Sequence, residues 1–217
     1  MAYRDDANTL NIKVVYYGPA LSGKTTNIIM LHELSGGQKG EIMIMETQGD
    51  RTLFFDAFPL GLTAPGGLRI KVKLYTVPGQ VAHNSTRKAI LSRADGICFV
   101  ADSQPRQAAN NSTALENLLE NMKLLGMDPE STPLCIQFNK RDLPDVMHES
   151  ALLDRWRETP WSDLCFASAL HGEGVIETFR SLMKKVFKQI DSEFGLSGSQ
   201  GLGCESFVNL LTAGEAA

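Results

Sequence analysis

Residues 18–25 read Gly-Pro-Ala-Leu-Ser-Gly-Lys-Thr and match the phosphate-binding pattern G-x-x-x-x-G-K-[S/T]. An apolar run at 12–17 precedes this stretch, and a helical pattern follows it. In such a loop, backbone N–H groups surround the phosphates of a nucleotide, and the next helix adds the positive end of its dipole. The alternative is a Gly-rich turn from strand to helix that holds no ligand. The flanking strand and helix favour the nucleotide-binding loop.

Within this loop, Lys24 is expected to place a positive charge against the β- and γ-phosphates, and Thr25 to offer its hydroxyl to Mg²⁺. The small glycines let the backbone approach the phosphates closely. The residues expected to contact the nucleotide in this stretch are Gly18, Pro19, Ala20, Leu21, Ser22, Gly23, Lys24, Thr25 and Thr26.

Length and charge limit the class of protein. A chain of 217 residues fits one domain plus a tail, and its net charge of −4 argues against nucleic acid or an anionic membrane as partner. Neither a signal peptide nor a run of membrane-spanning length is evident, and Cys204 lies too far from the end for prenylation. We therefore expect a cytoplasmic protein without a transmembrane segment or lipid anchor. Its four cysteines read as reduced thiols: Cys98, Cys135, Cys165 and Cys204.

Apolar runs alternate with helical patterns along the chain, which predicts an α/β fold with a mainly parallel sheet and helices on both faces. The run at 68–74 alternates apolar and polar residues, so we expect an edge strand with one wet face. Helical spacing of apolar residues marks 115–125 and 175–194. The runs expected to be strands are 12–17, 68–75, 96–101, 133–138 and 163–167.

Composition changes after residue 194. Residues 195–203 are rich in Gly and Ser, which predicts a mobile connection. We place a domain boundary there, with a domain at 1–194 and a flexible C-terminal tail at 195–217. The apolar piece 207–211 has two readings, docking on a protein surface or an unstructured end, and the composition favours the second.

The run Asn139-Lys140-Arg141-Asp142, which follows a predicted buried strand, indicates which nucleotide base the protein binds. Asp142 can accept hydrogen bonds from N1–H and the exocyclic amine of guanine, a donor pair that adenine lacks. Asn139 is expected to tie this run to the phosphate loop, and the Lys140 stem to lie over the base. Guanine is therefore favoured over adenine, which argues against an ATP-dependent kinase or ATPase.

A third segment follows the next strand and is expected to present a backbone N–H to the guanine carbonyl oxygen. Its residues are Ser168, Ala169 and Leu170. The histidines show no spacing typical of zinc ligands, and no motif supports a catalytic triad. The order of these three segments on one chain predicts a guanine-nucleotide site.

With these segments in place, the chain resembles the Ras-superfamily small GTPases, and within them the MglA-type bacterial GTPases of gliding motility and cell polarity. The resemblance covers roughly residues 11–190. It implies a three-layer, Ras-like P-loop NTPase fold that binds GTP or GDP with Mg²⁺. The segments that carry it are 16–19, 50–56, 75–80, 99–103 and 137–144.

The resemblance also implies roles for residues around the second switch. Gly79 would sense the γ-phosphate through its backbone N–H, and Gln80 would orient the attacking water. Arg51 matches the position of an arginine finger that the chain supplies itself. Without the resemblance, Arg51 beside Asp50 reads as a surface ion pair.

One departure from most small GTPases concerns the metal. Thr76 stands where an aspartate usually orders the water around Mg²⁺, as is usual in the MglA-like group. Metal coordination is therefore expected to depend on Thr25 and on Thr52, the threonine of the first switch.

A second departure is Ala20, which occupies a position where related proteins generally have glycine, close to the γ-phosphate. Its methyl group can crowd Gln80 and the arginine in the transition state, which predicts slow hydrolysis and a long-lived GTP state. The alternative is a loop that shifts slightly and tolerates alanine.

The expected function is a GTP-hydrolysing molecular switch whose state effectors recognise. The resemblance implies a roadblock-domain GTPase-activating protein, polarity or motility effectors and recruitment to a cell pole. The expected contact region is the sheet edge near 53–75, where a strand of this family shifts register between states. The alternative function is a GTP-locked binding module, which Ala20 makes credible.

Overall fold

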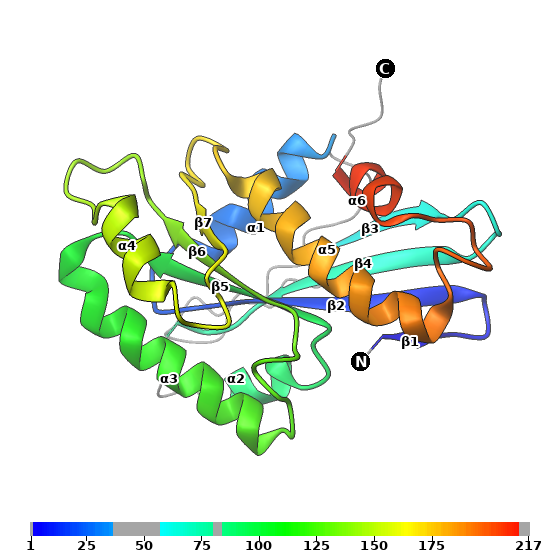
Figure 1. The fold of residues 1–217 in the computed structure, drawn as a ribbon, viewed down its shortest axis with the longest axis horizontal. Coiled ribbons are helices and arrows are strands. Elements are labelled where there is room, and N and C mark those ends of the chain that lie inside the picture. Colours follow the sequence, from blue (N-terminus) through cyan, green and yellow to red (C-terminus); the bar gives the residue numbers. More distant parts are fainter. Residues whose placement is uncertain (1, 37–56, 80–83, 213–217) are drawn as a thin grey trace.

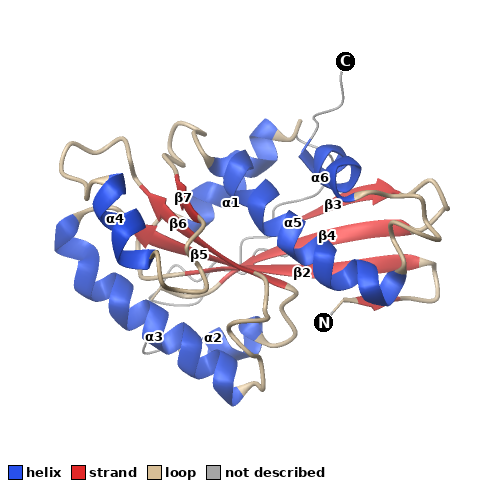
Figure 2. Cartoon of the chain, viewed as in Figure 1, coloured by secondary structure: helices blue, strands red, loops and turns tan. Residues whose placement is uncertain are grey.

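The strands of the chain form one sheet. The structure, a computed structural model, describes residues 2–36, 57–79 and 84–212. Within these ranges the strands pair in the order β3-β4-β2-β5-β6-β7, and β1 pairs with β2 (Figures 1 and 2). Neighbouring strands are parallel except at β3–β4 and β1–β2. The strands are β1 Tyr3–Arg4, β2 Thr9–Tyr17, β3 Ala57–Thr63, β4 Arg69–Thr76, β5 Gly96–Asp102, β6 Leu134–Asn139 and β7 Leu164–Phe166.

Helices cover both faces of this sheet (Figure 1). One hydrophobic cluster packs α1, α5 and α6 on the sheet, and a second packs α2, α3 and α4 on the opposite face. The mainly parallel sheet between two helical layers confirms the predicted fold class. The helices are α1 Lys24–Leu34, α2 Asn84–Leu91, α3 Ala108–Leu124, α4 Glu149–Trp156, α5 Val175–Phe194 and α6 Cys204–Thr212, with a short 3₁₀ turn at Pro105–Gln107.

The central strands explain why the sequence pattern predicted this architecture. Every residue of β5 and of β6 is buried, because helices cover both faces of these strands. On α5, buried side chains recur every three or four residues and face the sheet. The two predicted helices are present, the first as the longer α3, and each of the five predicted strands is found within a few residues of its expected bounds.

The expectation of an edge strand at 68–74 is wrong. β4 lies between β2 and β3, and the antiparallel β3 forms the outer strand on this side. The alternating pattern has another cause. One side of β4 carries Ile70, Val72 and Leu74 in the core, whereas Arg69 and Lys71 on the other side are exposed. A half-covered inner strand therefore produced the pattern of an edge strand.

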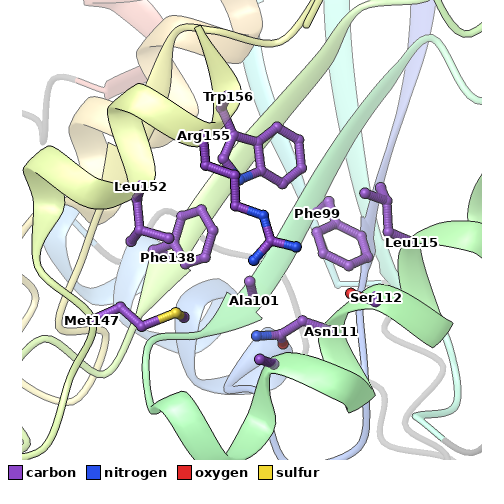
Figure 3. A pocket seen from close by; sticks show the side chains of 11 residues that line it. Phe99, Ala101, Asn111, Ser112, Leu115, Phe138, Met147, Leu152, Arg155 and Trp156 are labelled. Atoms are coloured by element: carbon purple, nitrogen blue, oxygen red, sulfur yellow. The ribbon is translucent and has the colours of Figure 1, made fainter.

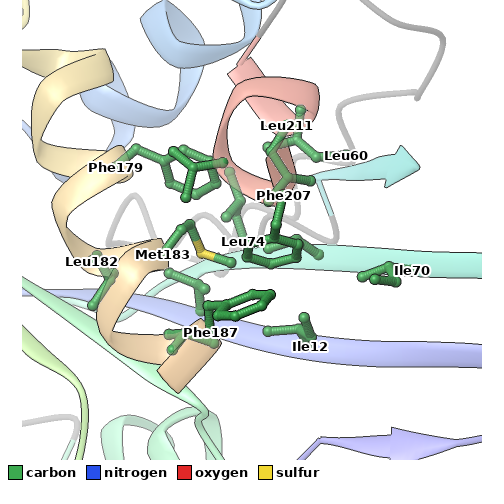
Figure 4. Close-up of a cluster of buried hydrophobic side chains, with 14 of the residues drawn as sticks. Ile12, Leu60, Ile70, Leu74, Phe179, Leu182, Met183, Phe187, Phe207 and Leu211 are labelled. Atoms are coloured by element: carbon green, nitrogen blue, oxygen red, sulfur yellow. The ribbon is translucent and has the colours of Figure 1, made fainter. Parts of the chain in front are cut away.

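The structure also corrects the prediction of a flexible tail for its residues 195–212. Gly195 ends α5 in the left-handed region at a φ of 62°, and Leu196 and Leu202 are almost fully buried. The chain then forms α6, whose Phe207 and Leu211 lie beside Leu60 of β3 (Figure 4). The Gly- and Ser-rich composition belongs to a tight turn that returns the chain to the sheet.

Polar contacts add to this docking of α6. Lys184 of α5 pairs with Glu205 at 2.6 Å, and Arg180 donates a hydrogen bond to the Thr212 hydroxyl at 3.1 Å. The Phe187 and Phe207 rings lie 5.3 Å apart between centroids. The 1–194 boundary therefore cuts through one hydrophobic cluster.

We expect Phe207→Ala to lower the free energy of unfolding by about 3 kcal/mol, because it removes a fully buried ring and leaves a cavity. Urea denaturation of the full chain measures this loss. Leu210→Ala is the matched control, since Leu210 lies on the same helix but is 50% exposed. Equal small losses for both variants would contradict the docking of α6.

Among the described residues, no helix is both long and apolar enough to cross a membrane.

Candidate functional site

Three loops meet at one edge of the sheet, where the parallel strands β2, β6 and β7 end. They are residues 18–25, 139–142 and 168–170. Asn139 joins all three. Its Nδ2 donates to the Ser22 carbonyl oxygen at 2.9 Å, and its Oδ1 accepts from the Ala169 N–H at 2.9 Å. The structure thus brings together the segments predicted to bind phosphate and base, through a side chain that is 2% exposed.

Two glycines of the phosphate loop have no room for a side chain. A Cβ on Gly18 would lie 2.3 Å from the Val100 carbonyl oxygen, and a Cβ on Gly23 would lie 2.2 Å from the Asn139 amide nitrogen. Both glycines also have positive φ angles, 146° and 95°. The close contact between Gly23 and Asn139 holds the phosphate loop against residues 139–142, the segment predicted to read the base and called here the base-reading loop.

Lys24 begins α1 and is buried in the phosphate loop. Its Nζ donates to the carbonyl oxygens of Pro19 at 2.6 Å and Gly18 at 3.2 Å. Burial, and then the charge of Arg87, lower the pKa of Lys24 to about 7. An anionic phosphate near this ammonium would favour its charged form, so the loop is suited to bind an anion.

The remaining loop residues differ in exposure. Ser22 is fully buried, Thr25 and Thr26 are half-buried at the start of α1, and Leu21 is 88% exposed with a φ of 60°. Thr25 therefore has a partly accessible hydroxyl at the positive end of a helix.

Ala20 lies against Gly79. A Cβ on Gly79 would lie 2.3 Å from the Ala20 Cα and 2.8 Å from its methyl carbon. The backbone at Gly79 therefore runs directly against the phosphate loop at the residue that departs from the family pattern. No larger residue fits at 79 in this arrangement.

The base-reading loop is held by two hydrogen bonds. The Asp142 carboxylate accepts a bond from the Ser168 hydroxyl at 2.7 Å, and the Lys140 ammonium pairs with Asp102 at 2.6 Å. Lys140 has a φ of 68° and a partly exposed side chain, while Asp142 itself is exposed. These contacts orient Asp142 and hold Lys140 by its charged end. That the Lys140 stem covers a base stays a prediction.

The segment 168–170 lies partly in the core. Ser168 and Ala169 are buried, and Leu170 is 65% exposed. The Ala169 N–H already donates to Asn139, so a guanine carbonyl must share this donor or use a neighbouring N–H. The particular N–H that reads the base stays a prediction.

A polar network under the loops positions α1. Gln137 of β6 donates to the Asn27 side chain at 2.8 Å and to the Thr178 hydroxyl at 3.0 Å. Asn27 in turn donates to the Gly23 carbonyl oxygen at 3.0 Å. This chain of bonds links β6, α5 and α1 beneath the phosphate loop, and the sequence motifs did not reveal it.

The sequence analysis also missed Arg87 of α2, a fully buried cation behind the phosphate loop. Its guanidinium donates to the Gly18 carbonyl oxygen at 3.3 Å and to the Asn117 side chain at 2.8 Å, and lies 4.4 Å from the centre of the Tyr17 ring. Within the described ranges no carboxylate pairs with it. Its helical spacing with the buried Ile90 and Leu91 is the signal that marks it as inward-facing.

Asparagines join Arg87 to the start of α2. Asn84 accepts from Asn117 at 3.0 Å and from Asn121 at 2.7 Å, and Asn121 also donates to the Tyr17 hydroxyl at 3.0 Å. The helix that follows the second switch is therefore fixed to α3 and to the end of β2. The half-buried Asn84 side chain therefore contacts α3.

Three predicted site residues, Arg51, Thr52 and Gln80, lie outside the described residues. Thr76, which replaces the usual aspartate, is described: it ends β4 and is 2% exposed.

A separate cavity of about 130 Å³ lies between the β5 and β6 strands and helices α3 and α4 (Figure 3). Its walls are mostly apolar, with Phe99, Phe138 and Trp156 among them, and Arg155 is its charged residue. Because a triphosphate needs many N–H donors or cations, these walls do not suit it. The three loops remain the candidate nucleotide site.

The candidate site offers few protein ligands for Mg²⁺, so it could hold the ion only when a nucleotide supplies further ligands. The described residues hold no group of three or more His, Cys, Asp or Glu able to bind a metal ion. Mg²⁺ is commonly held by few protein ligands together with phosphate oxygens and water. The Thr25 hydroxyl fits that mode.

Comparison with known proteins agrees with this geometry. The model of the ADP-ribosylation factor family matches residues 6–186, which include all three loops. Mutual gliding-motility protein MglA of Myxococcus xanthus (strain DK1622) is 41% identical over 184 residues, covering 83% of this chain and 93% of the relative. The chain therefore belongs to the ADP-ribosylation factor family of small GTPases.

Proposed function

We propose that this protein is a GTP-operated switch that hydrolyses GTP to GDP and phosphate. The observation that carries the proposal is the Asn139 side chain, which joins the phosphate loop to the segment after β7. Members of this family are generally GTP hydrolases. A nucleotide bound across these loops would contact elements from both halves of the sheet.

The arrangement at Asp142 supports guanine as the base. An ionised carboxylate has about four lone-pair positions, and the Ser168 hydroxyl takes one of them. Enough acceptors remain for N1–H and the exocyclic amine of guanine. Adenine has no matching pair of donors, so Asp142 would discriminate through its acceptors.

The proposed chemistry assigns roles that follow the family resemblance. Gln80 would orient the attacking water, and Arg51 would stabilise charge on the transferred phosphoryl group. Lys24 would contact the phosphates, and Thr25 and Thr52 would bind Mg²⁺. Bound Mg²⁺ supplies positive charge that neutralises the phosphate oxygens.

The proposed cellular role is control of gliding motility or cell polarity through effectors, by analogy with the name of the Myxococcus relative. A roadblock-domain GTPase-activating protein is the proposed partner, and the sheet edge at β3 and β4 is its proposed contact region. The pairing of β3 with β4 is irregular between Ala57 and Leu60, and such a break in register is compatible with a strand that shifts. Nucleotide-dependent recruitment to a cell pole from the cytoplasm completes the proposal.

The first test measures which nucleotide displaces fluorescently labelled GDP from the purified protein with Mg²⁺. GTP is expected to displace it at stoichiometric concentrations, and ATP only at far higher concentrations. Single-turnover hydrolysis is then followed with and without a roadblock-domain partner. Equal displacement by ATP would refute the guanine site, and GTP that persists with the partner would refute the hydrolysing switch.

The contact between Ala20 and Gly79 favours a second candidate, a GTP-locked module with little hydrolysis. In a switch that senses the γ-phosphate through Gly79, the Ala20 methyl would crowd the groups that must reach the transition state. Nucleotide binding needs only the backbone donors, which alanine leaves in place.

We expect Ala20→Gly to raise the rate of single-turnover GTP cleavage at least severalfold, because it removes the methyl beside Gly79. Ala20→Val, which enlarges the side chain, should lower the rate. Quench-flow measurement of released phosphate from preloaded protein checks both, and GTP affinity serves as the control. If the three rates agree, the methyl does not limit hydrolysis.

A further inference from the structure

Two thiols lie in contact beneath the loops that are expected to hold the base. The Sγ atoms of Cys135 on β6 and Cys165 on β7 are 3.2 Å apart, and both cysteines are free. Gln137 is the register partner of Cys165, so Cys135 lies one same-face position away along β6. We propose that Cys135 and Cys165 form a peroxide-sensitive thiol pair whose disulfide alters nucleotide release.

The two cysteines differ in a way that divides their chemical roles. Cys135 is fully buried, whereas Cys165 lies on the outer strand of the sheet and is partly exposed. Either thiol can donate in this contact. The hydrogen bond with Cys135 lowers the pKa of the Cys165 thiol, burial raises it, and the Thr178 and Ser181 hydroxyls and Lys185 lower it further. Because the thiolate is the nucleophile, Cys165 is the sulfur that meets the oxidant.

The oxidation is balanced with hydrogen peroxide as the oxidant. The Cys165 thiolate attacks one peroxide oxygen, the O–O bond breaks, and sulfenic acid forms while hydroxide leaves and takes up a proton as water. The Cys135 sulfur then attacks the Cys165 sulfur, the S–O bond breaks, and a second water leaves with the thiol proton. Two thiols thereby lose two electrons and two protons to one peroxide molecule.

Bond formation is expected to move the two strands. The two sulfurs have to approach from 3.2 Å to about 2.05 Å. Because the two residues are offset along their strands, the resulting disulfide is expected to be strained. Strained disulfides are the readily reduced ones, so the bridge is expected to be reversible by a thiol reductant.

The effect on nucleotide follows from position. Cys135 is four residues before Asn139, and Cys165 is three residues before Ser168, so one bridge pulls on both strands that carry the base-reading loops. The hydrogen bonds that the Ala169 N–H donates to Asn139 and the Ser168 hydroxyl donates to Asp142 connect the loops after the same two strands. This part rests on the proposed function: oxidation is expected to speed GDP release severalfold.

The first experiment treats the full chain with hydrogen peroxide, removes the oxidant and counts free thiols after unfolding. The expected result is loss of two of the four thiols, a Cys135–Cys165 peptide in a non-reducing digest, and recovery with dithiothreitol. Cys135→Ala and Cys165→Ser should each abolish this peptide. Cys204→Ser, on α6, is the matched control and should keep it. Absence of the peptide, or a Cys98–Cys135 bridge in its place, overturns the proposal.

The second experiment measures release of labelled GDP from oxidised and reduced protein. Faster release in wild type and in Cys204→Ser, but not in Cys165→Ser, supports the coupling; equal release with the bridge formed overturns it. The thiol count needs no nucleotide, so failure to bind guanine nucleotide would show separately as failure of the proposed function.

Discussion

Lys24→Met is expected to weaken GTP binding by about 10²- to 10³-fold, because it removes a buried cation from the phosphate loop while keeping its volume. The ammonium in the structure bonds to the Gly18 and Pro19 carbonyl oxygens, and phosphate oxygens would replace these neutral acceptors by charged ones. Titration of labelled GDP and GTP against purified protein measures the loss.

The same lysine predicts how affinity depends on pH. With a pKa of about 7 in this structure, Lys24 is largely neutral above pH 7, and bound phosphate must restore its proton. Binding therefore takes up a proton, and affinity is expected to fall as pH rises from 7, approaching tenfold per pH unit. The unfolded chain, with its ordinary lysine pKa near 10.5, binds more protons, so folding stability from this group rises with pH between about 7 and 10.5.

Lys24→Arg is the control for this dependence. Arginine stays charged throughout the range, so the variant keeps a cation but should lose the lysine contribution to the pH profile. Protonation of the nucleotide phosphates affects both proteins equally, so it cancels when the two pH profiles are compared. Parallel profiles for wild type and Lys24→Arg would show that Lys24 is already charged in the free protein.

The features of the candidate site that could be recognised in the sequence are those where the backbone dictates the residue. Gly18 and Gly23 must be glycine because a Cβ has no space, and Asn139 is the last residue of a parallel strand that ends at the phosphate loop. Such backbone constraints produce residue patterns of fixed spacing in the sequence. The strands β5 and β6 could also be predicted from the sequence, since burial on both faces favours consecutive apolar residues.

What could not be predicted depends on contacts between distant segments. β4 alternates because only one of its two faces is packed in the core, which no local pattern distinguishes from an edge strand. The sequence of α6 was interpreted as part of a flexible end, because its apolar residues are buried only through contacts with the distant β3 and α5. Arg87 belongs to no motif, and its role comes from Gly18 and Asn117, which lie 69 and 30 residues away in sequence.

Arg87→Ala is expected to lower the free energy of unfolding by about 4 kcal/mol, because it opens a cavity and leaves buried acceptors without a donor. Arg87→Met should cost only about 1 to 2 kcal/mol, since methionine fills most of the volume and burying an unpaired guanidinium is itself unfavourable. Urea denaturation separates the two. Equal losses would mean that the charge, rather than the packing, holds α2 on the phosphate loop.

Both Arg87 variants should also raise the pKa of Lys24, because the guanidinium charge adds to the burial that lowers it. The pH at which nucleotide affinity begins to fall is then expected to move upward in both, although their stabilities differ. Lys88→Met on the same helix is the matched control, with its side chain only partly buried, and should move neither quantity. Since packing and charge affect different measurements, an unmoved pH profile in Arg87→Met would exclude electrostatic coupling from Arg87 to the phosphate loop.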